Sequence, residues 1–471
     1  MNDGLITNAL WTAEDCAQAT GGRLVGADSW IATGVSIDTR SLAPGDLFVA
    51  LQDQRDGHDF LADAFSKGAS AAIVSRADAI DNAAGPALLA GDTLEALRGL
   101  ARASRARTRA RCCAITGSVG KTSVKEALAA CLAPSGPTHH AVKSFNNHIG
   151  VPLTLARMPA ASAFGVFEIG MNNRGEIAPL VALAAPHVAI VTTVAPVHIE
   201  NLGSLEAIAD EKADIYTGLT RDGVSLVPAD APHLDRLIRV AEMHGAATLL
   251  FGLGPECAAR LLSFEVGPDG SDAKADILGR PISYRVGAPG AHWATNSLAA
   301  LTAAALLGGD LEAAIEAMGR LEPAEGRGRA RRIEADFGAF TLVDDAYNAS
   351  PISVAAALDT LARRPAAIGA RRIAMLGDML ELGPDEAAYH AGLAAPIERA
   401  GVDLVFCAGP RMRALWDALP PERRGGYAED ADSLASVATG AVRDGDVVLI
   451  KGSNGSRMAR VVAALAALGR G

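Results

Sequence analysis

A glycine-rich turn followed directly by lysine and threonine is the clearest candidate for chemistry in this sequence. An apolar run that ends at Ile115 precedes the turn, and an Ala- and Leu-rich run follows it. Glycines let backbone N–H groups point toward a phosphate, a following helix adds partial positive charge, lysine adds a full charge, and threonine can bind Mg²⁺. We therefore predict that the phosphates of ATP or GTP bind here. The residues concerned are Gly117, Ser118, Val119, Gly120, Lys121, Thr122 and Ser123.

The turn departs from the full Walker pattern at one position. That pattern places a glycine where this sequence has Ile115, so only the short form Gly-x-x-Gly-Lys-Thr is present. The short form also occurs in proteins where it is only a structural turn. Here an apolar strand leads into it and a helix, predicted over 124–132, leads out. This order favours the nucleotide site.

Three further side chains are candidates for a role in metal binding or catalysis at the phosphates. Phosphoryl transfer needs acidic Mg²⁺ ligands near the phosphate loop. Glu168 ends an apolar strand and His198 follows another one into a loop, so both can face that site. A strand-end glutamate can equally be solvated, and a lone histidine can be structural. Lys212 lies among carboxylates on a predicted helix, and its surroundings in the sequence favour a surface lysine.

Two arginines lie near a predicted linker. The segment 322–328 interrupts the pattern of strands and helices with proline, glycine and charged residues. Closure of a domain could bring Arg327 or Arg329 onto a γ-phosphate, as an arginine finger does, but both could instead be solvated. Beyond the linker, residues 344–351 combine paired carboxylates with Tyr, Asn and Pro directly after a strand. Such a loop can face a ligand or can simply cap the next helix.

The elements that position these residues indicate an α/β fold, because Val- and Ile-rich runs alternate with Ala- and Leu-rich helices. The length of 471 residues, 49% of them hydrophobic, is enough for roughly three domains. We predict a small α/β domain over 1–108, a central P-loop ATPase-type domain with a mostly parallel sheet over 109–325, and a Rossmann-like domain over 326–471. The predicted strands are 30–37, 46–51, 71–74, the strand before the phosphate loop, which contains Cys112 and Cys113, and 163–169, 188–194, 224–227, 340–343, 373–376, 404–408 and 447–450.

The composition disfavours several classes of partner and site. The net charge of −11 disfavours nucleic-acid and anionic-membrane partners, and the arginines of 102–111 have no interleaved aromatic residues. No apolar run reaches the ~18–20 residues that span a bilayer, and no signal segment opens the chain. The six cysteines show no metal-ligand spacing. We expect a cytoplasmic monomer with reduced thiols and without an integral membrane segment.

The order and spacing of these motifs resemble the Mur ligase family, the ATP-dependent amide-forming enzymes of peptidoglycan precursor synthesis. The resemblance covers essentially the whole chain and accounts for the missing Walker glycine. The stretches that carry it are 38–51, 56–58, 116–126, 144–152, 168–171, 198–204, 211–215, His292 with Asn296, 344–351, 376–383 and 451–453.

Within the family, the chain is most similar to the members that add a dipeptide. The stretches Asp-Asp-x-Tyr-Asn-Ala and Gly-Asp-Met-Leu-Glu-Leu-Gly favour this group, and the Asp-Asn-Pro-Arg motif of an amino-acid-adding sibling is absent. The resemblance implies ATP-dependent addition of D-alanyl-D-alanine to UDP-N-acetylmuramoyl-tripeptide through an acyl phosphate, with Mg²⁺ as the metal. It also implies that the first domain binds UDP and that the third binds the dipeptide and closes over ATP.

The resemblance also implies roles for individual residues. Lys121, Lys212, His198 and Arg327 would be catalytic, with Arg329 as a rival to Arg327 at the γ-phosphate. Thr122, Glu168, His198 and Lys212 would bind Mg²⁺, Lys212 as a carbamate, because CO₂ turns a neutral lysine into an anion. Asn296 would contact the adenine side, and Asp345, Tyr347 and Asn348 would close over the nucleotide. Asp38, Thr39 and Arg40 would recognise the UDP part.

Small departures from the family pattern occur at His148, at 172–174 and at 453–457. They concern the substrate pocket rather than the reaction. Three other functions stay open. A sibling ligase would add a single amino acid, a P-loop small-molecule kinase would form ADP without free phosphate or an amide, and a nucleotide-binding regulatory protein would show no turnover stimulated by a UDP-muramoyl peptide.

Overall fold

The computed structural model describes residues 9–81, 85–142, 144–197, 199–366 and 368–469. Its strands form sheets of five, nine and six strands and one two-stranded pair. Helices cover the sheets, which confirms the α/β fold class. In the described part of the chain, no helix is both long and apolar enough to cross a membrane.

The N-terminal unit contains the five-stranded sheet, in the order β2-β7-β6-β5-β4. Strands β4 to β7 are parallel, and β2 is antiparallel at one edge. Because parallel strands end at the same edge, the loops after β4, β5 and β6 are neighbours. The elements are β1 (Trp11–Thr12), α1 (Ala13–Thr20), β2 (Arg23–Val25), β3 (Ile31–Ala32), β4 (Gly34–Ser36), β5 (Asp46–Val49), α2 (Leu61–Ser66), β6 (Ala71–Val74), α3 (Asp78–Asp81), β7 (Ala87–Leu89) and α4 (Thr93–Arg107).

The central unit contains nine strands in the order β16-β15-β14-β13-β12-β11-β8-β10-β9. The four strands expected here are present, but five more were missed, and the last two pairings, β14 with β15 and β15 with β16, are antiparallel. The strands are β8 (Arg111–Thr116), β9 (Thr138–His140), β10 (Phe164–Glu168), β11 (Val188–Val191), β12 (Val224–Pro228), β13 (Ala247–Gly252), β14 (Ala259–Val266), β15 (Ser271–Ile277) and β16 (Arg280–Val286).

Both faces of this sheet are buried at β8, β10 and β11, as expected for parallel strands covered by helices. Alternate residues of β8 point to opposite faces: Cys113 and Ile115 belong to one core, and Cys112 and Ala114 belong to the other. The covering helices are α5 (Lys121–Leu132), α6 (Gly150–Ala156), α7 (Ile177–Ala184), α8 (Ile199–Leu202), α9 (Leu205–Ala213), α10 (Leu234–His244), α11 (Trp293–Leu306) and α12 (Leu311–Gly319).

The C-terminal unit contains six strands in the order β17-β18-β22-β19-β20-β21, two more than the sequence predicted. The strand β17 is antiparallel to β18, and the other pairs are parallel. The elements are β17 (Arg329–Ala335), β18 (Gly338–Asp345), α13 (Pro351–Arg363), β19 (Arg372–Gly377), α14 (Glu386–Ala391), α15 (Ala394–Arg399), β20 (Leu404–Ala408), α16 (Arg413–Ala418), β21 (Arg424–Ala428), α17 (Ala431–Ala441), β22 (Val447–Lys451) and α18 (Ala459–Ala466).

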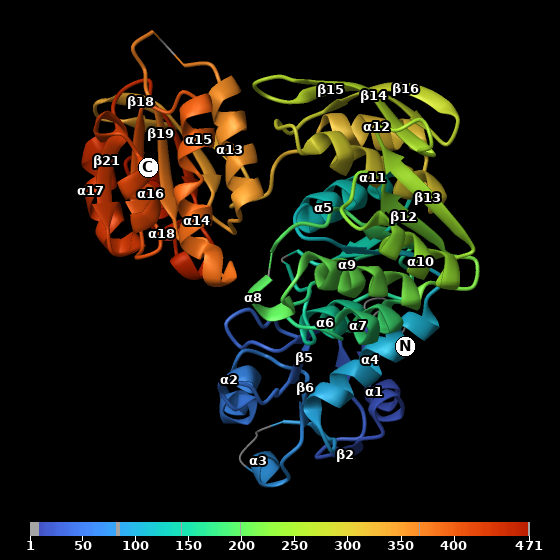
Figure 1. Cartoon of the computed structure of the whole chain (residues 1–471). Coiled ribbons are helices and arrows are strands. Elements are labelled where there is room, and N and C mark those ends of the chain that lie inside the picture. Colours follow the sequence, from blue (N-terminus) through green and yellow to red (C-terminus); the bar gives the residue numbers. More distant parts are fainter. Residues whose placement is uncertain (1–8, 82–84, 143, 198, 367, 470–471) are drawn as a thin grey trace.

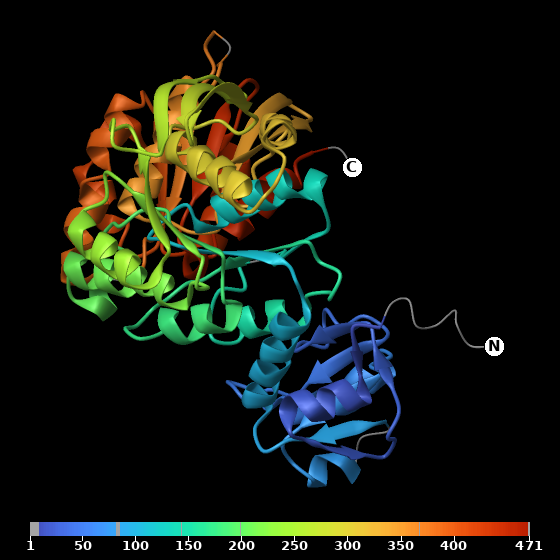
Figure 2. The ribbon, with the colours of Figure 1, turned by 90° about the vertical axis from the view of Figure 1, so that its right-hand side faces the viewer.

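The N-terminal and C-terminal units adjoin the central unit on different sides (Figures 1 and 2). The C-terminal unit lies beside the central one, with α13 on the side that faces it, and the blue N-terminal unit lies below. Helix α4 packs against α6 and connects the N-terminal and central units. Segment 321–328 lies between α12 and β17 without helix or strand, as expected of a linker.

Candidate active site

The phosphate loop follows β8 and ends where α5 begins. Gly120 has a φ of +89°, and an added Cβ there would lie 2.8 Å from Oδ1 of Asn296. At Gly117 an added Cβ would lie 1.9 Å from Oγ1 of Thr192. Both positions therefore require glycine. Because Gly120 precedes Lys121 and offers no side chain as a cap, the first amide groups of α5 remain open to an anion.

Hydrogen bonds to the segment after β11 hold the loop in place. The amide of Ser118 donates to the carbonyl of Thr193 at 2.9 Å. Its hydroxyl donates to the carbonyl of Ala195, also at 2.9 Å, and the hydroxyl of Thr192 donates to the carbonyl of Val119 at 2.6 Å. The loop is thus fixed in shape before any ligand arrives, which lowers the cost of binding one.

Lys121 and Thr122 open α5 at the base of this loop. The ammonium of Lys121 donates to the carbonyl of Gly117 at 2.6 Å. Burial lowers the pKa of Lys121, while nearby Glu168 acts in the opposite direction. The hydroxyl of Thr122 donates to Oε2 of Glu168 at 2.8 Å. The structure therefore brings together three residues that the sequence had singled out.

The carboxylate of Glu168 is 3% exposed and is held at both oxygens. Thr122 occupies Oε2, and Nδ2 of Asn146 donates to Oε1 at 2.8 Å. The hydroxyl of Ser144 lies 3.1 Å from Oγ1 of Thr122. No role for Ser144 or Asn146 could be predicted from the sequence, because only the fold brings their loop to the end of β10.

Lys212 is buried, so the alternative of a surface lysine is wrong. It is 2% exposed, and burial, together with the charge of Lys121, lowers its pKa well below the ordinary value. Its neighbour Glu211 fixes the helix by accepting backbone N–H groups from Gly175, Glu176 and Ile177 at 2.6, 3.0 and 3.0 Å. A neutral amine in this position is suited to reaction with CO₂.

The described residues supply only part of the expected set of metal ligands. His198 lies outside the described residues. Among those that are described, no group of three or more His, Cys, Asp and Glu side chains is placed to hold a metal ion. Thr122 and Glu168 supply oxygen donors, which suit Mg²⁺. A complete metal site here would need further ligands, such as a carbamate on Lys212.

The linker places Arg327, and not Arg329, at the phosphate loop. Gly326 and Gly328 donate backbone hydrogen bonds to the side chain and the carbonyl of Asp344 at 3.2 and 2.7 Å. Arg327 lies 4.3 Å over the ring of Tyr347, and its Nη2 donates to Oγ of Ser144 at 3.2 Å. Arg329 instead lies in β17, 3.6 Å from an exposed glutamate, with 44% of its side chain exposed.

A buried lysine organises the loop after β18. The ammonium of Lys451 is 2.7 Å from Oδ2 of Asp345 and donates to the carbonyl of Asn348 at 3.0 Å. Burial raises the pKa of Asp345, and the charge of Lys451 opposes this rise. Lys451 lies in one of the stretches that resemble the family, but no role could be predicted for it, because β22 lies between β18 and β19 only in the fold.

These parts meet in one cavity of about 430 Å³ between the central and C-terminal units. Residues 118–123, Glu168 and Asn296 line it from the central side. Arg327, Asp345, Tyr347 and Asn348 line it from the other side. Lys212 is not among the lining residues, but it is close enough to Lys121 for the charge there to lower its pKa. The cavity therefore unites most of the residues that the sequence had proposed for the nucleotide.

Asp38, Thr39 and Arg40 lie outside this cavity, after β4. Arg40 forms an ion pair with Asp38 at 2.6 Å, and 87% of its side chain is exposed. Thr39 is buried, and its carbonyl accepts a hydrogen bond from Lys67 at 3.0 Å. An exposed guanidinium at the carboxyl edge of a parallel sheet is accessible to an anionic ligand.

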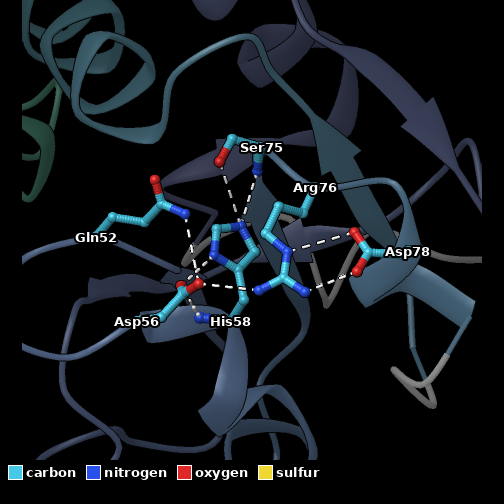
Figure 3. A network of polar contacts seen from close by, with 6 residues as sticks. All are labelled: Gln52, Asp56, His58, Ser75, Arg76 and Asp78. Carbon is cyan, nitrogen blue, oxygen red and sulfur yellow. Dashed lines mark hydrogen bonds and ion pairs between the residues drawn. The ribbon is translucent and has the colours of Figure 1, made fainter.

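A polar network fixes the neighbouring loops of the same edge (Figure 3). The amide of Ser75 donates to Nε2 of His58 at 2.9 Å, so Nδ1 carries the proton and donates to Asp56 at 2.6 Å. The guanidinium of Arg76 forms ion pairs with the carboxylates of Asp56 at 3.0 Å and Asp78 at 2.7 Å. The network connects the loops after β5 and β6 and gives this edge a rigid shape.

Comparisons with known proteins agree with this arrangement. The Mur ligase family, catalytic domain, matches residues 32–105, the Mur ligase middle domain matches 115–304, and the Mur ligase, glutamate ligase domain, matches 328–454. The UDP-N-acetylmuramoyl-tripeptide–D-alanyl-D-alanine ligase of Escherichia coli is 34% identical over 94% of this chain and 96% of its own length.

Solved structures show the same fold. MurF from Acinetobacter baumannii has a TM-score of 0.82 and 26% identity, covering 97% of this chain and 99% of that one. MurF from Thermotoga maritima, solved in complex with ADP, has a TM-score of 0.74 and 24% identity, covering 92% and 97%. The chain therefore belongs to the Mur ligase family, within its group of UDP-N-acetylmuramoyl-tripeptide–D-alanyl-D-alanine ligases.

Proposed function

We propose that this chain uses ATP to join D-alanyl-D-alanine to UDP-N-acetylmuramoyl-tripeptide in peptidoglycan precursor synthesis. Family membership supports the reaction. The observation that carries the proposal is the single cavity in which the phosphate loop, the Thr122–Glu168 pair and Arg327 converge. Anion-binding amides, a hydroxyl–carboxylate pair and a cation from the adjoining unit are together what phosphoryl transfer requires.

The reaction has two steps. The terminal carboxylate of the tripeptide attacks the γ-phosphorus of ATP in line, which forms an acyl phosphate and releases ADP. The free amine of the dipeptide then attacks the acyl carbon, and phosphate leaves as the amide forms. Lys121, the loop amides and Arg327 neutralise charge on the transferred group. The C-terminal unit on the far side of the cavity excludes water, which would hydrolyse the acyl phosphate.

The donor set fits Mg²⁺ once Lys212 is modified. Thr122 and Glu168 supply oxygen atoms, and a carbamate on Lys212, whose lowered pKa favours the neutral amine, would add an anionic ligand. We assign His198 as the remaining protein ligand. Bound Mg²⁺ would neutralise the phosphate charge during transfer.

The remaining residues are assigned binding roles according to the unit in which they lie. Asn296 contacts the adenine side, and Asp345, Tyr347 and Asn348 close over the nucleotide from the C-terminal unit. Asp38, Thr39 and Arg40 recognise the UDP part. We divide the chain into a UDP-binding domain over 1–108, an ATP-binding domain over 109–325 and a dipeptide-binding domain over 326–471. We further propose that the protein acts as a cytoplasmic monomer.

Phosphate release tests this function directly. The assay contains ATP, Mg²⁺, UDP-N-acetylmuramoyl-tripeptide and D-alanyl-D-alanine, omits each component in turn, and identifies the product by mass spectrometry. Release that needs every component and yields the pentapeptide supports the proposal. Release with a single amino acid would assign the chain to a sibling reaction. ADP without free phosphate or an amide would indicate a kinase, and no turnover with any amine would overturn the enzymatic proposal.

A further inference from the structure

A row of four polar side chains connects the linker to the buried carboxylate at the phosphate loop. Nη2 of Arg327 donates to Oγ of Ser144 at 3.2 Å. That hydroxyl lies 3.1 Å from Oγ1 of Thr122, and Thr122 donates to Oε2 of Glu168 at 2.8 Å. The row begins on the linker, passes through the loop before α6, and ends on β10.

The direction of each hydrogen bond in this row is fixed. A threonine hydroxyl has one proton, and Thr122 gives its proton to the carboxylate of Glu168, which can only accept. Ser144 must therefore donate to Thr122. Its own oxygen accepts from Arg327, because a guanidinium cannot accept. Ser144 thus both receives the arginine and contacts the threonine of the phosphate loop.

Arg327 is attached to the C-terminal unit by its neighbours. The amide of Tyr347 donates to the carbonyl of Gly326 at 3.1 Å, and Gly328 donates to the carbonyl of Asp344 at 2.7 Å. The ring of Tyr347 lies 4.3 Å under the guanidinium. Movement of the loop after β18 therefore carries Arg327 with it, while Ser144 belongs to the central unit.

We propose that Ser144 is a positioning residue that receives Arg327 at the phosphate loop and couples it to Thr122. The catalytic role of this contact rests on the proposed function. Under that function, the contact positions Arg327 for the γ-phosphate before ATP is bound. Without the hydroxyl, the guanidinium keeps its stacking on Tyr347 but loses this hydrogen bond to the central unit. The loss concerns phosphoryl transfer rather than the binding of ATP.

The contact is tested first in the ligand-free full-length protein. Phenylglyoxal reacts with free guanidinium groups, and peptide mass spectrometry measures its rate at Arg327 and at Arg329 in the same sample. We expect Ser144→Ala to raise the rate at Arg327 by about two- to tenfold, the factor that corresponds to one net hydrogen bond. Arg329 is the internal control and keeps its rate. Ser144→Thr, which retains a hydroxyl, restores protection.

Steady-state kinetics then separate positioning from a general loss of structure. We expect Ser144→Ala to lower kcat for phosphate release with little change in KM for ATP, and Ser144→Thr to recover most of it. In the Arg327→Ala background, Ser144→Ala should lower kcat no further, because the two residues act as a unit.

An unchanged phenylglyoxal rate at Arg327 in Ser144→Ala would overturn the proposal, as would kcat losses that multiply in the double variant. The chemical modification needs no substrate. If it responds as expected while the wild-type protein forms no pentapeptide, the contact stands and the proposed function fails. The two conclusions can therefore be separated.

Discussion

Lys121 supplies a positive charge at the base of the phosphate loop. Its ammonium is anchored to the carbonyl of Gly117 at 2.6 Å and faces the cavity. We expect Lys121→Ala to lower dipeptide-dependent phosphate release by about 100-fold or more, the effect of removing one charge-stabilising donor. The exposed Lys274 on β15 provides a matched control, and Lys274→Ala should keep the wild-type rate. A Lys121→Ala rate equal to that of wild type would contradict the mechanism.

Arg327 and Arg329 differ by two positions in the sequence but face different surroundings. Arg327 contacts Ser144 at the cavity, whereas Arg329 pairs with Glu322 at the surface. We therefore expect Arg327→Ala to reduce kcat by about 100-fold, and Arg329→Ala to leave it close to wild type. Phosphate-release kinetics on both variants decide between them, and the reverse order of effects would make Arg329 the γ-phosphate contact.

At this scale, the sequence predicts which residues lie at the cavity where the signal is local. Lys121 and Thr122 directly follow the glycines of the phosphate loop, and Glu168 ends an apolar strand. Lys212 could not be placed from its neighbours, because the burial that lowers its pKa comes from the fold around α9. No role was predicted for Ser144 and Lys451 for the same reason. Their partners, Arg327 and Asp345, are more than a hundred residues away in the chain.

At the scale of elements, β8 is joined to the segment before β11 through His187. Nδ1 of this histidine accepts the amide of Cys112 at 3.0 Å, and its own amide donates to the carbonyl of Cys112 at 2.7 Å. Burial, with help from Arg111 and Arg105, lowers its pKa from 6.5 to about 4. Protonation in the folded state would also break the hydrogen bond at Nδ1.

The lowered pKa of His187 predicts acid sensitivity. Between pH 6.5 and about 4 the unfolded chain binds this proton and the folded chain does not, so stability falls as the pH falls through this range. Because the ring is only half-buried, solvent screening keeps the loss to about 1–2 kcal/mol. In His187→Asn, Oδ1 can still accept the amide but does not titrate, so we expect a flatter dependence. Urea unfolding at several pH values measures both slopes, and identical slopes would contradict this assignment.

Several strands with fully buried apolar runs were predicted, whereas short or half-exposed strands were missed, interior ones such as β7 and β13 included. The runs at β6 and β20 match their predicted bounds, because buried parallel strands are uniformly apolar. The strands β15 and β16 alternate buried and exposed residues at the edge of the central sheet, and β17 carries a run of exposed charged residues. A half-exposed antiparallel edge gives a weak apolar signal, so these strands were missed.

At the scale of the whole molecule, the N-terminal and central units are joined by contacts whose partners lie in both. Nε1 of Trp11 donates to the carbonyl of Ala156 at 2.8 Å, and Nε of Arg157 donates to the carbonyl of Val35 at 2.6 Å. Within the N-terminal unit, the guanidinium of Arg107 lies 3.8 Å over the Trp11 ring and holds that ring at the interface. Neither of the two hydrogen bonds between the units could be read from the sequence, because both need the α4–α6 packing to exist first.

These contacts predict that the two units unfold together. Trp11 is 1% exposed, so Trp11→Phe keeps most of the packing but leaves the Ala156 carbonyl without its donor, at a cost of about 1–3 kcal/mol. Calorimetry with hydrogen-exchange mass spectrometry should show residues 9–325 shifting together to lower temperature. In Trp416→Phe, which alters the Trp416–Tyr427 ring pair of the C-terminal unit, only residues 326–469 should shift. If Trp11→Phe destabilised 9–108 while 109–325 kept its transition, the N-terminal unit would be an independent folding unit, because a shared transition requires that the interface be lost in the same step as both cores.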